Sequence, residues 1–227
     1  MDTSGSTSPE PVPQTDTGAT TAPGSPQQRP RDQPSIVIAG PSGVGKGILI
    51  EKLLNQHPDA FVTAISHTTR KPRDGEVAGE DYHFVERKEF EKMVELEAFV
   101  EHAEFNGEQY GTSKRAISAE GIEEDKILLL DIDVSGVDAL RKIKETDEDM
   151  AHLSPRYVFI RPPSMDVLEA RLRSRNKNTE VGIIWRLYTA RYEMLIAESS
   201  VSGFDKVITN DDLDKALEEL EEFIFEK

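Results

Sequence analysis

The stretch GPSGVGK, residues 40–46, follows the apolar run 35–39 and precedes a helical pattern of apolar residues. A short buried strand, a glycine loop ending in Gly-Lys and the start of a helix form the context of a phosphate-binding loop. Glycines let the backbone curl so that its N–H groups point at phosphate oxygens, and the lysine adds a positive charge. The sequence therefore predicts that a nucleotide binds through Gly40, Pro41, Ser42, Gly43, Val44, Gly45, Lys46 and Gly47.

The loop departs from the usual pattern at the residues after Lys46. A Ser or Thr normally follows the lysine and contacts Mg²⁺. Gly47 and Ile48 stand here instead, and neither side chain carries a hydroxyl. We expect phosphate binding to be retained and metal positioning to be altered.

Length and composition narrow the classes of protein. A chain of 227 residues suits one α/β domain with a tail. With no cysteine, disulfides and thiolate metal sites are excluded. The formal net charge of −16 argues against nucleic acid and anionic membranes as partners. The start of the sequence contains no apolar run, so neither a signal peptide nor a membrane anchor is expected. The expected location is cytoplasmic.

The first 34 residues are predicted to be a disordered tail. They contain seven of the thirteen prolines and no aromatic residue. Such a segment buries too little apolar surface to offset its chain entropy. The folded domain is therefore expected to span 35–227.

Within 35–227, apolar runs alternate with helical patterns, which indicates a parallel sheet covered by helices on both faces. Strands are expected at 36–38, 61–66, 82–85, 99–105, 109–111, 126–132, 157–160 and 206–209. Helices are expected at 46–56, 88–96, 113–120, 134–143, 164–174, 180–198 and 213–224, with Trp185 packed in the region 171–190. The predicted fold is an α/β nucleotide kinase with a phosphate loop, a small mixed insert at about 66–115 and an arginine-rich lid at about 171–190.

A set of ordered motifs resembles the guanylate kinases, which transfer a phosphoryl group from ATP to GMP. The matching segments are 40–46, 66–73, 75–76, 79–84, 99–101, 110–112, 130–133, 136–137 and 210–211. The resemblance covers the domain from about residue 35 to its end. It implies that the insert binds GMP and that ATP and Mg²⁺ are required.

Two arginines in the loop after residue 66 suit an anionic acceptor. Guanidinium groups hold phosphate oxygens by paired, charge-assisted hydrogen bonds. The resemblance assigns Arg70 and Arg73 to the GMP phosphate, with hydroxyls from Tyr82 and Tyr110. Packing in the core is the alternative role for each tyrosine.

Recognition of guanine is expected from a carboxylate on the strand at 99–105. Guanine offers two adjacent donors, N1–H and the exocyclic amine, which one carboxylate accepts together. The resemblance assigns Glu101 to this role, aided by Ser66, Thr112 and Asp133. Without the surrounding motif, Glu101 would be read as a surface glutamate.

The residues expected to bind ATP and its metal ion lie at the end of the strand at 126–132 and in the lid. Asp131 ends a buried strand, where ligands bind in open α/β sheets, and it is the expected metal residue. The resemblance assigns the ATP phosphates to Arg171, Arg175 and Arg186, which act with Lys46 as the catalytic cations. It places Asn210 beside adenine.

Two other functions remain open from the sequence. A guanylate-kinase-like module that binds without catalysis is favoured only by Gly47-Ile48 and Val181-Gly182, and it would normally have lost Lys46. A kinase for AMP or UMP is disfavoured by Glu101 with Ser66. The expected protein is a monomer or weak homo-oligomer whose ligands are GMP and ATP.

Overall fold

The computed structural model describes residues 33–105, 107–118, 122, 125–174, 179–199 and 202–225. The larger part of the fold is a sheet with flanking helices. It contains β1 (Gln33–Ala39), α1 (Lys46–Gln56), β2 (Phe61–Thr63), β7 (Ile127–Asp131), α3 (Val134–Thr146), β8 (Leu153–Arg161), β9 (Lys206–Thr209) and α6 (Leu213–Phe225). Its five strands are all parallel, in the order β2-β7-β1-β8-β9. This is the parallel sheet that the alternating pattern predicts.

The core lies on both faces of this sheet because side chains along a strand alternate. On β1, Ile36 and Ile38 join one apolar cluster with α1, α6 and α4 (Met165–Ser174). Val37 and Ala39 join the other cluster, with α3 and β7. The buried central strand therefore ends between two packed layers, and the chain leaves it at the glycine loop.

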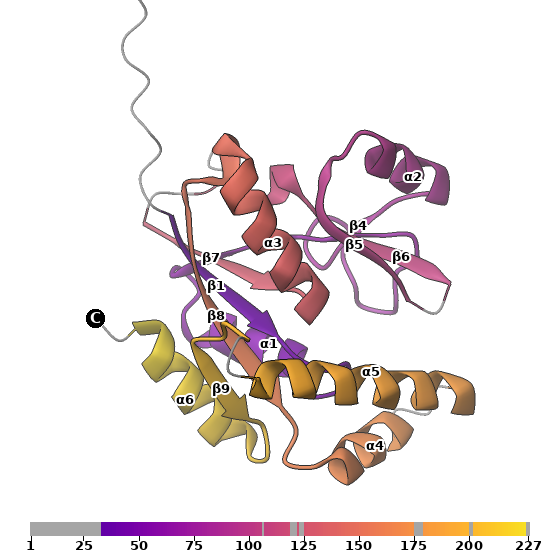
Figure 1. The fold of residues 1–227 in the computed structure, drawn as a ribbon, viewed down its shortest axis with the longest axis vertical. Helices are drawn as coiled ribbons and strands as arrows, with labels where there is room; N and C mark the ends of the chain where they lie inside the picture. The colour runs from indigo at the N-terminus through magenta and orange to yellow at the C-terminus, as the bar shows by residue number, and fades with distance from the viewer. Residues whose placement is uncertain are drawn as a thin grey trace, which may run out of the picture.

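A second, smaller sheet is built from the segment between β2 and β7. Its order is β4 (His83–Phe84), β3 (His67–Thr68), β6 (Glu108–Ser113) and β5 (Phe99–Phe105). β3 and β4 are parallel, whereas β6 is antiparallel to both β3 and β5. The helix α2 (Arg87–Glu95) connects β4 to β5, and in Figure 1 it lies at the outer end of this sheet.

The small sheet and the pair α4–α5 project from the same side of the large sheet (Figure 1). α5 (Glu180–Glu198) is the longest helix in the described part of the chain and packs along α4. Its N-cap Thr179 accepts a hydrogen bond from the Gly182 amide at 3.1 Å, so Gly182 does not interrupt the helix. The packed position expected for Trp185 is wrong, because 64% of its surface is exposed.

Other element boundaries differ from the expectations. β1 starts at Gln33, two residues before the expected domain start, while the tail up to residue 32 lies outside the described residues. The helix expected at 113–120 is described only as a 3₁₀ turn, η1 (Lys114–Ile117). A further turn, η3 (Glu148–Met150), precedes β8.

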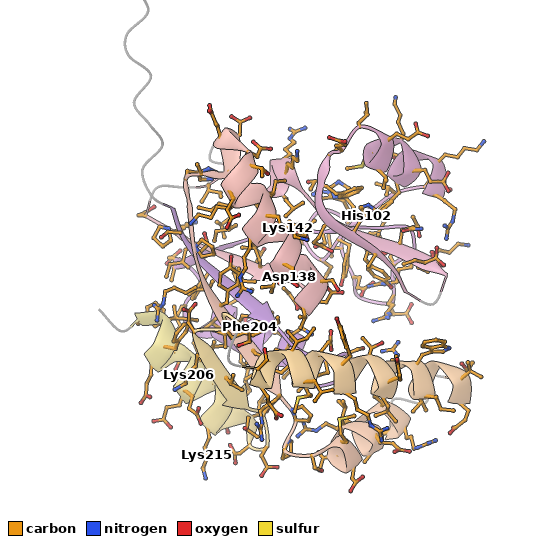
Figure 2. All side chains as sticks on the ribbon, viewed as in Figure 1. His102, Asp138, Lys142, Phe204, Lys206 and Lys215 are labelled. Carbon is orange, nitrogen blue, oxygen red and sulfur yellow. The ribbon has the colours of Figure 1, made fainter. Side chains whose placement is uncertain are left out.

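One arginine joins α3 to the segment before β9. The Arg141 guanidinium donates to the carbonyls of Ser202, at 2.9 Å, and Gly203, and lies 4.4 Å from the Tyr157 ring centroid. Phe204, labelled in Figure 2 below α3, packs on Phe159 with centroids 5.2 Å apart. No helix within the described residues is both long and apolar enough to cross a membrane.

Candidate functional site

The loop at 40–46 has a shape that depends on its glycines, as Gly40 and Gly45 show. Gly40 has a φ of 143°, and a Cβ there would lie 2.2 Å from the carbonyl oxygen of Ile160. Gly45 has a φ of 106°, and a Cβ there would lie 2.5 Å from the Asn210 amide nitrogen. Gly45 is also the N-cap of α1 and supplies no side-chain cap. The loop is thus a tight turn at a positive helix end, as an anion site requires.

Residues from the far end of the chain hold the loop from outside. The Val44 carbonyl accepts hydrogen bonds from Asn210 Nδ2 at 2.9 Å and Arg171 Nη1 at 3.3 Å. Arg171 Nη1 also donates to the Asn210 carbonyl at 2.9 Å. These residues, with Ile48 and Asp211, line a cavity of about 280 Å³ beside the loop. Two predicted site residues, Arg171 and Asn210, therefore bond the loop backbone and also line this cavity.

Charged and polar side chains meet at the front of the loop. Lys46 Nζ donates to the Gly40 carbonyl at 2.6 Å and lies 3.9 Å from Asp131 Oδ1. Arg186 Nη1, on α5, donates to Ser42 Oγ at 2.6 Å. Desolvation in the cleft raises the pKa of Asp131, although nearby Lys46 lowers it and 47% of the side chain is open to solvent. The predicted cations from the loop and the lid helix therefore converge here.

A polar cluster lies where β5 and β6 of the small sheet meet α3. Glu101 Oε1 accepts a hydrogen bond from the Thr112 amide at 2.9 Å, and Thr112 Oγ1 lies 3.0 Å from Ser66 Oγ. Burial raises the pKa of Glu101, against the lowering effect of the Thr112 hydrogen bond. The structure thus brings together three of the residues expected to read guanine.

Asp133, the fourth of these residues, starts α3. Its Oδ1 caps the helix by accepting from the Gly136 amide at 2.7 Å. Gly136 lets α3 approach the small sheet, because a Cβ there would lie 3.0 Å from Glu101 Cγ. Asp133 also contributes to the raised pKa of Glu101, so the two carboxylates share one electrostatic environment.

The acceptor arginines lie in the loop after β3. Arg70 forms a two-point ion pair with Glu76, with Nη1–Oε2 at 2.5 Å and Nη2–Oε1 at 2.8 Å. Its guanidinium lies 4.9 Å from the centroid of Tyr82, which in turn contacts Tyr110 edge to face at 6.2 Å. The Arg73 amide donates to Glu76 Oε2 at 2.7 Å.

A cavity of about 390 Å³ runs between the two halves of the site. Its lining includes Gly47 from the start of α1, Ser66 and Tyr82 from the insert, and Asp131 from β7. The pKa of Tyr82 is raised first by desolvation and next by Asp131. The phosphate loop and the insert thus face one another across a space that a phosphoryl group could cross.

The lid prediction is only partly covered by the structure. Arg175 lies outside the described residues. Arg173, two residues earlier in the sequence, is exposed and binds Glu169 and Glu180 at 2.7–2.8 Å, which ties α4 to the start of α5.

Sequence reasoning assigned no role to two glutamates. Glu76 holds Arg70, and this pairing lowers its pKa to about 2. Glu193 is 6% exposed on the inner side of α5, and burial raises its pKa to about 7 although Lys46 opposes the shift. The sequence did contain one signal for Glu193. It lies seven residues after Arg186, which places both side chains on the same side of the helix.

Three comparisons agree on what the chain resembles. A family model described as guanylate kinase matches residues 32–227. A guanylate kinase of Sus scrofa is 46% identical over 194 residues, covering 85% of this chain and 92% of its own length. One of Schizosaccharomyces pombe is 46% identical and covers 82% and 87%. A crystal structure of guanylate kinase from Anaplasma phagocytophilum has a TM-score of 0.59 at 29% identity, covering 85% and 84%.

Proposed function

Because the chain belongs to the guanylate kinase family, we propose how its residues divide the work of the family reaction. Its activity is the ATP-dependent phosphorylation of GMP to GDP. A module that binds without catalysis is not favoured. The observation that carries the assignment of roles is the convergence of Lys46 and Arg186 on the loop, opposite the Arg70–Glu76 pair.

ATP is assigned to the loop side of the site. Backbone amides of residues 40–47 receive the phosphates at the start of α1. Lys46, Arg171 and Arg186 neutralise the charge of the transferring group, joined by Arg175 from the segment outside the described residues. The cavity of about 280 Å³ beside Asn210 receives the adenine.

GMP is assigned to the insert. Arg70, Arg73, Tyr82 and Tyr110 hold its phosphate. Glu101 accepts the two guanine donors, and Ser66, Thr112 and Asp133 complete the base site. A buried carboxylate left without those donors disfavours other bases, which is how such sites discriminate strongly.

The residues present fit one Mg²⁺ ion held mainly by substrate. Within the described residues no three acidic or histidine side chains cluster as a cage. Mg²⁺ commonly takes one or two carboxylates, substrate phosphates and water, and Asp131 offers that carboxylate 3.9 Å from Lys46. When bound, the ion would supply charge neutralisation at the phosphates of ATP. The Ile48 side chain supplies no oxygen, so Asp131 has the larger share of metal positioning.

The transfer itself needs alignment and charge neutralisation. An oxygen of the GMP phosphate attacks the γ-phosphorus in line, ADP leaves, and GDP forms. That oxygen is already largely ionised at neutral pH, so no general base is required. Arginines arriving from α4 and α5 exclude water while they neutralise charge.

The first experiment measures ADP formation from Mg-ATP with GMP, AMP, UMP or no acceptor. We expect GMP-dependent turnover in the range of 1–100 per second that is typical of kinases. Arg73→Ala should lower kcat/KM for GMP by roughly ten- to a hundredfold, as loss of a charge-assisted contact implies.

Lys71→Ala, which removes a neighbouring exposed cation, is the matched control. Equal effects of the two substitutions would contradict the assignment of Arg73. GMP binding without turnover would show that the acceptor pocket operates but the donor side does not.

A further inference from the structure

One face of α5 is apolar and uncovered. Six of its side chains are each more than half exposed: Val181 (65%), Ile184 (58%), Trp185 (64%), Tyr188 (68%), Tyr192 (61%) and Leu195 (69%). We call them the α5 stripe. In a chain with 31% charged residues, only one exposed charged residue, Arg191, interrupts this face between its two ends. An exposed patch of this kind marks an interaction surface.

The stripe points away from the nucleotide site. The side of α5 that packs on the protein carries Ile183, Ala190, Glu193 and Ala197. At 3.6 residues per turn, Tyr188 lies roughly 160° around the helix from Ala190. Arg186, which donates to the phosphate loop, is on the packed side. A partner on the stripe would therefore leave the substrate cleft open.

The spacing within the stripe is that of a helix–helix seam. Val181, Trp185, Tyr188, Tyr192 and Leu195 follow one another at alternating intervals of four and three residues. This is the heptad pattern with which one helix packs along another. Ile184 and Arg191, seven residues apart, flank it. The occupant that this pattern fits is a helix with its own apolar seam.

We propose that this occupant is α5 of a second copy of the chain, packed antiparallel about a two-fold axis between Trp185 and Tyr188. In that arrangement Trp185 of each copy meets Tyr188 of the other, and Val181 meets Tyr192. The Trp185 and Tyr188 rings already contact edge to face at 6.0 Å, so the axis would join two such pairs. Two-fold interfaces use one self-complementary patch in this way.

Charge and area support the same partner. Antiparallel pairing brings Arg191 of one copy beside Glu180 at the start of α5 in the other, and it opposes the two helix dipoles. The six exposed side chains offer on the order of 800 Å² per copy, which is what each partner contributes to a standard interface. The stripe also avoids the acidic residues that give each copy its charge of −16.

Sedimentation velocity of the chain tests the proposal across a concentration series up to about 100 μM. This is above the weakest dissociation constants, in the micromolar range, of interfaces with this area. We expect a dimer. Tyr188→Glu should weaken dimerisation at least about thirtyfold, the effect of losing a central contact. Leu96→Glu alters an equally exposed apolar residue outside the stripe (68%) and should leave the dimer intact.

A monomer at every concentration would overturn the proposal, as would a dimer that both substitutions weaken equally. A dimer that appears only after residues 1–32 are deleted would assign the stripe to that segment. Thermal unfolding of each variant separates loss of association from loss of folding, and the wild-type result decides the question if Tyr188→Glu does not fold.

Cysteine trapping tests the orientation, because the chain has no cysteine of its own. Val181→Cys mixed with Tyr192→Cys should give a disulfide between the two variants under mild oxidation. Neither variant alone should cross-link. Cross-linking of each variant with itself would indicate parallel helices and overturn the proposed pairing.

Discussion

Glu76 accepts from both terminal nitrogens of Arg70, at 2.5 and 2.8 Å, and from the backbone amide of Arg73 at 2.7 Å. One carboxylate thus fixes the Arg70 side chain and the Arg73 backbone, and these are the two arginines proposed to hold the acceptor phosphate. Because this pairing lowers the pKa of Glu76 to about 2, the carboxylate stays ionised throughout the neutral range.

Replacing Glu76 tests whether this support matters for GMP. Glu76→Gln keeps the shape but removes the charge, so Arg70 loses its fixed geometry. We expect the KM for GMP to rise by about tenfold, with a smaller change in kcat. Asp74→Asn, an exposed acidic residue of the same loop, is the control. A lower KM would instead mean that Glu76 competes with the GMP phosphate for Arg70.

Glu101→Gln tests base recognition. The amide cannot accept both guanine donors, and its NH₂ group would face one of them. We expect kcat/KM for GMP to fall by about a hundredfold while the value for AMP changes little. Glu104→Gln, on the opposite face of β5, should leave both values unchanged. An unaltered ratio of GMP to AMP activity in Glu101→Gln would refute the assignment.

Ile48→Thr restores the hydroxyl that the phosphate loop lacks. Ile48 is 48% exposed, so the change removes little buried apolar surface. We expect the Mg²⁺ concentration for half-maximal activity to fall by roughly two- to tenfold, the worth of one added polar contact. Ile48→Val has the same branched shape without the oxygen. Identical Mg²⁺ dependence of the two variants would exclude a role for the missing hydroxyl.

The raised pKa of the buried Glu193 carboxyl leads us to expect that the stability of the protein depends on pH. Burial raises its pKa to about 7 in the folded protein, above its ordinary value of 4.5. Between these values the folded state binds more protons than the unfolded state, so the free energy of unfolding falls as pH rises from about 5 to 7. Glu193→Gln should remove this loss and be more stable than the wild type at pH 8 by on the order of 2 kcal/mol.

Urea unfolding at pH 5 and pH 8 measures the effect. Glu91→Gln, an exposed glutamate on α2, should follow the wild-type trend. If Glu193→Gln loses as much stability as the wild type between the two pH values, another group is responsible.

The fold was predictable wherever local pattern and packing agree. The boundaries of α1, β5 and β9 match the sequence prediction because each run is set by apolar periodicity and ended by a turn signal. β8 begins at Leu153, four residues early, and contains Pro155. A proline is tolerated there because β9 pairs only with Val158–Arg161 and does not extend beside it.

The site was less predictable, because the contacts that hold its side chains form only when distant segments pack together. Motifs identified Arg70, whereas the role of Glu76 follows from a loop closure that the sequence pattern does not encode. Glu193 looks like any helical glutamate until α5 is packed. Trp185 was misplaced because α5 is apolar on two sides, and the pattern alone does not say which side meets the core.

The bonds from Asn210 and Arg171 to the Val44 carbonyl have a consequence for the order of folding. The phosphate loop is synthesised well before its outer support, because Arg171 and Asn210 lie more than a hundred residues further along the chain. Asn210 directly follows β9, which pairs with β8 at the edge of the sheet. A nascent chain therefore acquires the supports of its proposed ATP pocket only after residue 210 has been made, and a product that stops before β9 would have the loop sequence without the bond from Asn210.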